Sequence, residues 1–316
     1  MKRAGLIVLG GLAAFLAAFA LWAWAPDTDR DAMWAKYGPG DAVAEADAMR
    51  VRYRVSGPEG APVLVMIHGT AGSLETWEPL RGRLDRTYRV IAYDQPGHGL
   101  TGPHPDRAYG YDGMADGLQA VLAAEGVDRA VLIGNSMGGW IAWRHALAAP
   151  EVVTALVLLN ASGIPSDEAP DSALGFRIMR SPLGRAASQR LTPRAAIAAS
   201  THDAISREEI ITDAMIDRYW EMLRYPGNRR AMADMFATER DDQSARLGDI
   251  DVPTLVIWGD EDQLVPVASA QGFADRMPDA RAVIYEGVGH LPMEEVPGET
   301  ARDIRAFLKT IDLRSD

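Results

Sequence analysis

The chain has 316 residues, of which 47% are hydrophobic and 24% are charged, a length that allows one large domain or about two smaller ones. It contains no cysteine, which excludes a disulfide framework and any cysteine-ligated metal site, and its apolar content is too high for a disordered chain. With 44 acidic and 32 basic residues the formal charge is −12, which argues against a broad basic surface for nucleic acid.

An apolar segment stands at the N-terminus. Basic residues at positions 2 and 3 precede an uncharged run over residues 4–25, which as a helix would reach about 33 Å and so cross a hydrocarbon core of about 30 Å. The basic residues favour the cytoplasmic side, and Trp22 and Trp24 stand where an interfacial aromatic belt would lie. The sequence therefore predicts residues 1–25 as a transmembrane helix in a bacterial inner membrane, with the lipid bilayer as a partner and the remaining chain on the periplasmic side.

The alternative for this segment is a cleaved secretory signal, with Ala23-Trp24-Ala25 as the cleavage site and release into the periplasm. Pro26 directly after that site disfavours cleavage, and the apolar run is long for a signal. The anchor is therefore the preferred prediction. Residues 26–45 are polar and contain Gly38-Pro39-Gly40, which is typical of a tether.

From residue 46 the pattern alternates between short apolar strands and helices. Residues 50–55 alternate with period two, as in a half-exposed strand. The apolar runs that buried parallel strands need lie at residues 63–67, 90–93, 130–133, 155–159, 254–258 and 282–285. Helical patterns between them lie at residues 74–84, 111–124, 137–147, 267–276 and 300–311. This alternation predicts an α/β fold with a mostly parallel central sheet flanked by helices.

One long insertion interrupts the alternation. Between Leu159 and Thr254 only helical patterns occur, at residues 194–200, 213–223 and 229–238. Because parallel sheets bind ligands at the carboxyl ends of their strands, we expect residues 163–247 to form a helical cap over a site, between core segments 46–162 and 248–316. Several apolar cap residues either line a pocket or pack as core, namely Met179, Met215, Trp220, Met222, Met232, Met235 and Phe236.

The strongest functional signal is the G-x-S-x-G pentapeptide Gly134-Asn135-Ser136-Met137-Gly138, between a predicted strand and a predicted helix. A sharp turn there would expose the Ser136 hydroxyl, and the small residues on both sides let strand and helix approach closely. A phosphate-binding loop is the alternative, but the P-loop ending and the Rossmann glycine spacing are both absent. The pentapeptide therefore predicts Ser136 as a nucleophile.

A serine hydroxyl is a weak nucleophile until a base takes its proton. Among the six histidines, His290 follows the last predicted strand, in the small-residue loop 287–290 that precedes the last predicted helix. A structural imidazole is the alternative for an isolated histidine. The loop position and the chain order favour His290 as the catalytic base.

The third member of a serine triad is a carboxylate that orients the imidazole. The loop after the next-to-last predicted strand offers Asp260, Glu261 and Asp262. We predict Asp262, with the other two as close rivals that could serve only as turn formers or solvated charges. The resulting chain order is Ser136, Asp262, His290.

Four motifs together resemble the α/β-hydrolase fold family. They are Ile67-His68-Gly69-Thr70, Asp94-Gln95-Pro96-Gly97-His98-Gly99, Gly134-Asn135-Ser136-Met137-Gly138-Gly139 and Gly287-Val288-Gly289-His290. With Asp262 they run from about residue 50 to the C-terminus. The chain is thus similar to lid-bearing serine hydrolases, both esterases and hydrolases of meta-cleavage products.

The resemblance also assigns supporting roles. It implies that the backbone N–H groups of Thr70 and Met137 form the oxyanion hole, where losing one donor typically costs about 100- to 1000-fold in rate. It further implies that His68, Gly69 and Asp94 support the loop that carries Thr70.

The expected activity is hydrolysis of carboxylic esters or small lactones through an acyl-enzyme, with a small apolar ester-like substrate, no nucleic acid partner and no metal or organic cofactor. The first alternative is a carbon–carbon bond hydrolase of the meta-cleavage type. The second is a non-catalytic, membrane-tethered ligand-binding protein, because fold alone does not establish function. The sequence leaves the oligomeric state open.

Overall fold

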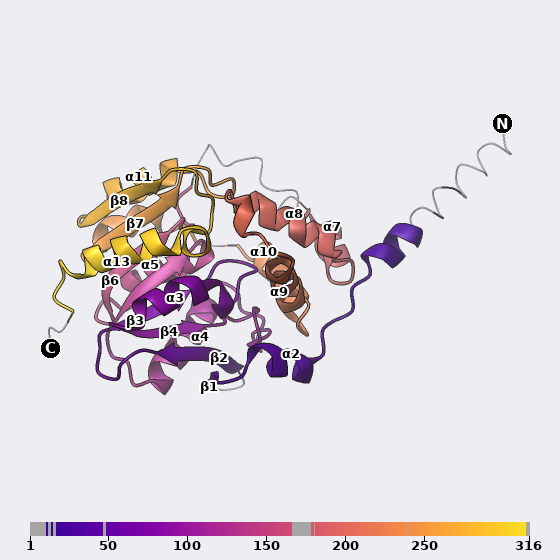
Figure 1. Ribbon diagram of the computed structural model, residues 1–316, viewed down its shortest axis with the longest axis horizontal. Helices are drawn as coiled ribbons and strands as arrows, with labels where there is room; N and C mark the ends of the chain where they lie inside the picture. The colour runs from indigo at the N-terminus through magenta and orange to yellow at the C-terminus, as the bar shows by residue number, and fades with distance from the viewer. Residues whose placement is uncertain are drawn as a thin grey trace.

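The computed structural model describes residues 11, 14, 17–46, 49–165, 178–179, 181–239 and 241–313. Within these residues an eight-stranded sheet forms the centre of the molecule, in the order β1-β2-β4-β3-β5-β6-β7-β8 (Figure 1). The strands are β1 Ala42–Ala46, β2 Met49–Ser56, β3 Val63–Ile67, β4 Arg89–Tyr93, β5 Ala130–Asn135, β6 Val153–Leu159, β7 Thr254–Gly259 and β8 Ala280–Tyr285. β2 is antiparallel to both of its neighbours, and the other neighbouring pairs are parallel. The predicted mostly parallel α/β sheet is confirmed.

Helices cover both faces of this sheet. They are α3 Glu78–Leu84, α4 Tyr111–Ala124, α5 Met137–Ala148, α11 Ala268–Arg276, α12 Pro292–Glu295 and α13 Pro297–Leu308, with a 3₁₀ turn at Leu74–Trp77 before α3. Successive strand side chains point to opposite faces. In β3, Leu64 and Met66 belong to the core cluster under α3 and α13, whereas Val65 and Ile67 belong to the cluster under α4, α5 and α11. Both faces of β3 are therefore buried, which explains why consecutive residues of this strand are apolar.

The parallel register brings the carboxyl ends of several strands to one edge of the sheet. Ile67 of β3 lies opposite Gly134 of β5, and Asn135 of β5 lies opposite Leu159 of β6. β7 and β8 are paired to their last residues. The loops that follow these strands therefore start near one another, at the edge where parallel sheets bind ligands.

Helices α7 to α10 lie between β6 and β7 in the sequence and beside this edge in space (Figure 1). They are α7 Pro182–Ser188, α8 Arg194–Ala204, α9 Asp213–Leu223 and α10 Asn228–Ala237, with 3₁₀ turns at Glu208–Ile210 and Ser244–Asp249. In the described part of this insertion the regular structure is helical, apart from an isolated bridge at Leu191. A helical cap is thus present, while its boundaries at residues 163 and 247 stay predictions.

Residues 26–45 differ from the predicted tether. They contain most of β1 and all of α2 Arg30–Tyr37, whose first turn is capped by the Asp29 carboxylate accepting from the Ala32 N–H at 2.8 Å. The helix contacts the cap, because the Trp34 indole donates to the Tyr225 hydroxyl at 3.2 Å. This polar stretch is therefore held by hydrogen bonds that its composition does not reveal.

The predicted transmembrane helix over residues 1–25 requires a correction. Among the described residues, no helix combines the length and the apolar composition that crossing a bilayer requires. Trp24 instead forms a bridge with Leu191 of the cap, and Ala23 and Ala25 are only 0% and 3% exposed. Ala23 and Ala25, at the end of the predicted span, are thus buried against protein, whereas the Trp22 and Trp24 side chains are exposed. Residues 1–10, 12–13 and 15–16 lie outside the described residues.

The membrane assignment changes with it. The predicted location in a bacterial inner membrane, its periplasmic alternative and the contact with a lipid bilayer all rested on the apolar N-terminal segment, read as an anchor or as a cleaved signal. The first two are corrected, and the third has no support in the described part of the chain. The physical reason is that an apolar run contacts protein as favourably as lipid, so composition alone does not separate the two.

Candidate active site

Ser136 occupies a sharp turn between β5 and α5. Its φ and ψ are 53° and −119°, a conformation that costs a residue with a Cβ on the order of 1–3 kcal/mol. Small neighbours make the turn possible, because a Cβ on Gly138 would overlap the carbonyl oxygen of Ile67, and a Cβ on Gly134 would overlap the backbone of Gly138. The strand–turn–helix context predicted for the pentapeptide is present, and it places Ser136 at the N-terminus of α5, where negative charge is favoured.

His290 and Asp262 are bonded to each other in the buried interior. The His290 Nδ1 atom lies 2.8 Å from Asp262 Oδ2, which also accepts from the Asn160 amide at 2.6 Å. The other carboxylate oxygen accepts from the backbone N–H groups of Leu264 and Val265 at 2.8 and 3.0 Å. Burial alone would raise the pKa of Asp262, but the charge and hydrogen bond of His290, followed by the other donors, outweigh it and lower that pKa.

The two rival acids have other surroundings. The Asp260 carboxylate accepts from the backbone N–H of Gly287 at 2.8 Å, which closes the turn between the β7 and β8 loops. Glu261 is exposed. Of the three acids in this loop, Asp262 is the one that the structure brings to the imidazole.

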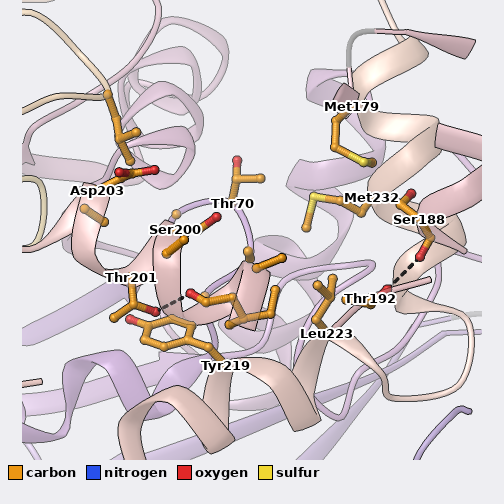
Figure 2. Close-up of a pocket in the computed structure, with 18 of the residues that line it drawn as sticks. Thr70, Met179, Ser188, Thr192, Ser200, Thr201, Asp203, Tyr219, Leu223 and Met232 are labelled. Carbon is orange, nitrogen blue, oxygen red and sulfur yellow. Dashed lines mark hydrogen bonds between the residues drawn. The ribbon is translucent and has the colours of Figure 1, made fainter. Parts of the chain in front are cut away.

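Ser136 and His290 line the same pocket, which has a volume of about 340 Å³. Gly69 and Thr70 line it too, from the loop after β3, and most of the other lining residues belong to the cap (Figure 2). Because the Asp262 carboxylate contacts Nδ1 of the imidazole, Nε2 is the ring nitrogen that remains for another partner. The pocket therefore collects the predicted nucleophile and base in one concave site under the cap.

The apolar cap residues divide between the two roles that the sequence allowed. Met179, Met232 and Phe236 line the pocket. The remaining ones, Met215, Trp220, Met222 and Met235, do not line it. Figure 2 shows Met179 and Met232 beside each other in the pocket wall. The pocket surface that they contribute is hydrocarbon and thioether.

Two hydroxyl groups in the pocket wall donate hydrogen bonds to backbone carbonyl oxygens of the cap. Thr192 Oγ1 donates to the Ser188 carbonyl oxygen at 2.8 Å, and Thr201 Oγ1 donates to the Ile197 carbonyl oxygen at 2.9 Å (Figure 2). Since each donor is already paired, these side chains offer a ligand mainly their methyl groups. The walls are thus suited to an apolar group.

The loop predicted to hold the oxyanion lies against the nucleophile. A Cβ on Gly69 would come within 2.9 Å of the Ser136 Cβ, so a side chain at position 69 would press on the turn. Met137 is the first residue of α5, and the Thr70 hydroxyl lies 3.5 Å from its sulfur. The structure therefore brings Thr70 and Met137 to the same end of the pocket as Ser136.

The predicted supporting residues His68 and Asp94 form hydrogen bonds with this loop and with the segments next to it. His68 Nε2 accepts from the Gln95 backbone N–H at 3.1 Å, and His68 Nδ1 lies 2.8 Å from the Gly69 carbonyl oxygen. This pattern requires a neutral imidazole that donates from Nδ1. Asp94 accepts from the backbone N–H of Leu74 at 2.8 Å, which ties β4 to the turn after the loop.

The acid dependence of stability follows from two buried histidines. Burial lowers the pKa of His68 to about 4, and burial with the nearby His68 lowers the pKa of His98 to about 3. Both values lie below the unfolded value of about 6.5, so the unfolded chain binds more protons in acid, and stability present above that pH is lost as the pH falls toward the folded values. Between pH 7.5 and 5.0 we expect each histidine to remove about 2 kcal/mol from the free energy of unfolding.

Denaturant unfolding at the two pH values checks this expectation. A free energy of unfolding that is equal at pH 7.5 and 5.0 would contradict the expectation.

Three residues of the site were missed by the sequence analysis. Asn160 follows β6 with a φ of 47° and donates to Asp262, and its only sequence signal is a polar residue directly after a buried strand. Arg52 is fully buried and bonds Asp94 at 3.0 Å, although it stands in a strand predicted as half-exposed. Glu295 lies after the His290 loop and has no motif that singles it out.

Comparison with known proteins gives the family. A family model described as alpha/beta hydrolase fold matches residues 62–297. The crystal structure of a membrane phospholipase A, described as a bacterial virulence factor, is 26% identical, with 100% of both chains covered and a TM-score of 0.76. The esterase RhEst1 from Rhodococcus sp. ECU1013 is 27% identical over 86% of this chain and 100% of its own, with a TM-score of 0.73.

A third similar structure agrees in fold alone. The meta-cleavage product hydrolase CumD from Pseudomonas fluorescens IP01 is 24% identical, with 85% of this chain and 97% of that chain covered and a TM-score of 0.73. The resemblance predicted from the four motifs is thereby confirmed at the level of the family. From its sheet, its strand–turn–helix serine and the match over residues 62–297, this chain belongs to the alpha/beta hydrolase fold family.

Proposed function

We propose that the protein is a serine hydrolase that cleaves carboxylic esters or small lactones through an acyl-enzyme. One observation carries the proposal: Ser136 on its strained turn and His290, bonded to Asp262, line the same mainly apolar pocket. A nucleophile, a base within the same site and a group that orients the base are the parts that covalent catalysis by serine needs.

In the proposed mechanism the Ser136 oxygen attacks the carbonyl carbon while His290 Nε2 takes its proton. Asp262 holds the imidazole by Nδ1 and stabilises the imidazolium. The backbone N–H groups of Thr70 and Met137 stabilise the negative charge that develops on the carbonyl oxygen. His290 then protonates the leaving alcohol. Water, deprotonated by His290, attacks the acyl-enzyme and releases the acid.

An apolar acyl group is the substrate part that the pocket favours. Met179, Met232 and Phe236 offer apolar contact, and the wall hydroxyls of Thr192 and Thr201 are paired with the backbone. Burying a methylene group in such surroundings is worth about 0.8 kcal/mol. The names of two similar structures, an esterase and a phospholipase A, also favour an ester bond as the target.

The experiment that tests the proposal is labelling of the purified protein with a fluorophosphonate, followed by mass spectrometry of the digest. We expect one adduct per chain, on Ser136, and loss of p-nitrophenyl ester hydrolysis in parallel with labelling. The heat-denatured protein is the control and should remain unlabelled. No adduct on the native protein, or an adduct on another serine with full activity retained, would contradict the proposal.

A carbon–carbon bond hydrolase is the second candidate, because the sequence Asn135-Ser136-Met137-Gly138-Gly139 resembles that of meta-cleavage hydrolases. The two reactions can share one triad, so substrate preference must separate them. We favour esters, and expect kcat/KM for a p-nitrophenyl ester to exceed that for a dienoic diketone. The reverse order would favour carbon–carbon bond cleavage.

A further inference from the structure

The backbone around His290 is held by both the core and the cap. The His290 N–H donates to the carbonyl oxygen of Ala204 in the cap at 2.8 Å. Its carbonyl oxygen accepts from the side-chain amide of Asn135 at 3.0 Å, next to the nucleophile. The cap segment at Ala204 is therefore in direct contact with the residue proposed as the base.

The carboxylate of Glu295 joins the same two segments. It accepts from the backbone N–H groups of Gly289 and Leu291, on either side of His290, at 3.0 and 3.2 Å. It also accepts from the backbone N–H groups of Ser206 and Arg207 in the cap, at 3.0 and 3.1 Å. One side chain thus pairs four backbone donors from two parts of the chain.

The chemistry of these bonds requires a carboxylate. Glu295 is only 5% exposed, so donors around it would be left unpaired without it. A carboxylate offers two acceptor oxygens, and hydrogen bonds to it are about twice as strong as those between neutral groups. An amide at the same position would offer one acceptor and point its own donors at backbone N–H groups.

The contact between loop and cap is also close. A Cβ on Gly289 would lie 2.8 Å from the Ala204 carbonyl oxygen and 2.9 Å from the Ser206 nitrogen. The absence of a side chain at position 289 therefore lets the cap backbone rest on the His290 loop. The cap and the base loop form one hydrogen-bonded unit, with the Glu295 carboxylate between them.

We propose that Glu295 is a positioning residue that fixes the His290 loop to cap residues 206–207. It thereby keeps the imidazole in the position from which it takes the proton of Ser136. This inference rests on the proposed function, in which His290 is the base. Glu295 does not line the pocket and acts through the backbone alone. A misplacement of a catalytic group by about 1 Å can cost on the order of 100-fold in rate.

The first test is the Glu295→Gln variant. We expect its rate constant for fluorophosphonate labelling and its kcat for ester hydrolysis to fall by about 10- to 100-fold, with KM changed by less than about threefold. A loss confined to KM, or wild-type rates in a folded variant, would overturn the inference. Circular dichroism and thermal unfolding establish that the variant is folded.

The neighbouring acid supplies the matched control. Glu294 is buried like Glu295, but its carboxylate bonds Arg218 at 2.9 Å and the Tyr219 hydroxyl at 2.7 Å, both on α9 and not on the His290 loop. Glu294→Gln makes the same change of charge one residue away. We expect its labelling rate to fall by much less than that of Glu295→Gln. An equal fall in both variants would assign the effect to charge or general stability and overturn the inference.

A second pair of variants removes one bond without touching the carboxylate. Arg207 has a φ of −83°, near the value that proline fixes, and its N–H donates to Glu295. Arg207→Pro deletes this donor, whereas Arg207→Ala keeps it and deletes only the side chain. We expect kcat and the labelling rate of the proline variant to lie about threefold or more below those of the alanine variant.

These outcomes separate the inference from the proposed function. If the wild-type protein is not labelled at Ser136, the proposed function fails. If it is labelled, and Glu295→Gln is labelled as fast, the function stands and the positioning role is overturned. Should Glu295→Gln not fold, the Arg207 pair decides, and equal rates in its two members would overturn the inference.

Discussion

Replacing Ser136 with alanine is expected to lower kcat/KM for ester hydrolysis by at least about 10⁴-fold while leaving the protein folded. The variant lacks the only atom that can form the acyl-enzyme in the proposed mechanism, so what remains is stabilisation by the backbone donors and by binding. Alanine has a Cβ as serine does, and therefore meets the same strain at a φ of 53° without a new overlap. The measurement is steady-state hydrolysis of a p-nitrophenyl ester, with thermal unfolding recorded alongside.

Ser269 provides the comparison for this variant. It is a buried serine of α11 that does not line the pocket, and its hydroxyl has no hydrogen-bond partner. Ser269→Ala should retain the wild-type kcat/KM. Substantial turnover by purified Ser136→Ala, above that of a mock preparation, would exclude Ser136 as the nucleophile.

Asp262→Asn is expected to lower kcat by about 10⁴-fold with little change in fold. An amide can present its N–H₂ to the imidazole, which favours the tautomer with the proton on Nε2, and that tautomer cannot accept the proton of Ser136. The loss of the carboxylate also removes the charge that stabilises the imidazolium. Pre-steady-state measurement of acyl-enzyme formation should show the loss in the first chemical step.

Asp260→Asn is the matched comparison, because it makes the same change two residues away. Asp260 bonds the backbone of Gly287 rather than the imidazole, so we expect a change in kcat of less than about threefold. If Asp260→Asn were the more damaging substitution, the acid would have to be reassigned to position 260.

Local patterns were sufficient for the sheet and for the candidate nucleophile and base. The runs at residues 63–67 and 130–133 are apolar because both faces of a parallel sheet are covered, and this leaves a mark in the sequence. The glycines at positions 134 and 138 mark a tight turn with no room for a side chain at either position, which makes Ser136 the candidate nucleophile. The acid needed spatial information, since three neighbouring residues offered the same chemistry and only Asp262 contacts His290.

The described end of the N-terminal apolar run shows what composition alone does not predict, namely which surface the run will contact. The run ending at Ala25 is apolar enough for lipid, yet Trp24 pairs with Leu191, and Asp27 forms an ion pair with Arg229 at 2.5 Å. Both partners, Leu191 and Arg229, belong to the cap and lie far away in the sequence. The residue pattern of one segment does not predict which distant segment it will contact.

The sequence by itself therefore determined the α/β alternation, the helical insertion and the candidates for nucleophile and base, because periodicity and tight turns depend on neighbouring residues. Only the tertiary structure decided that Asp262 is the acid that contacts His290, that Asn160 and Glu295 form hydrogen bonds with Asp262 and with the His290 loop, and that residues 23–25 pair with the cap. Those outcomes depend on hydrogen bonds and close contacts between segments far apart in the chain, whose formation is a property of the folded arrangement as a whole.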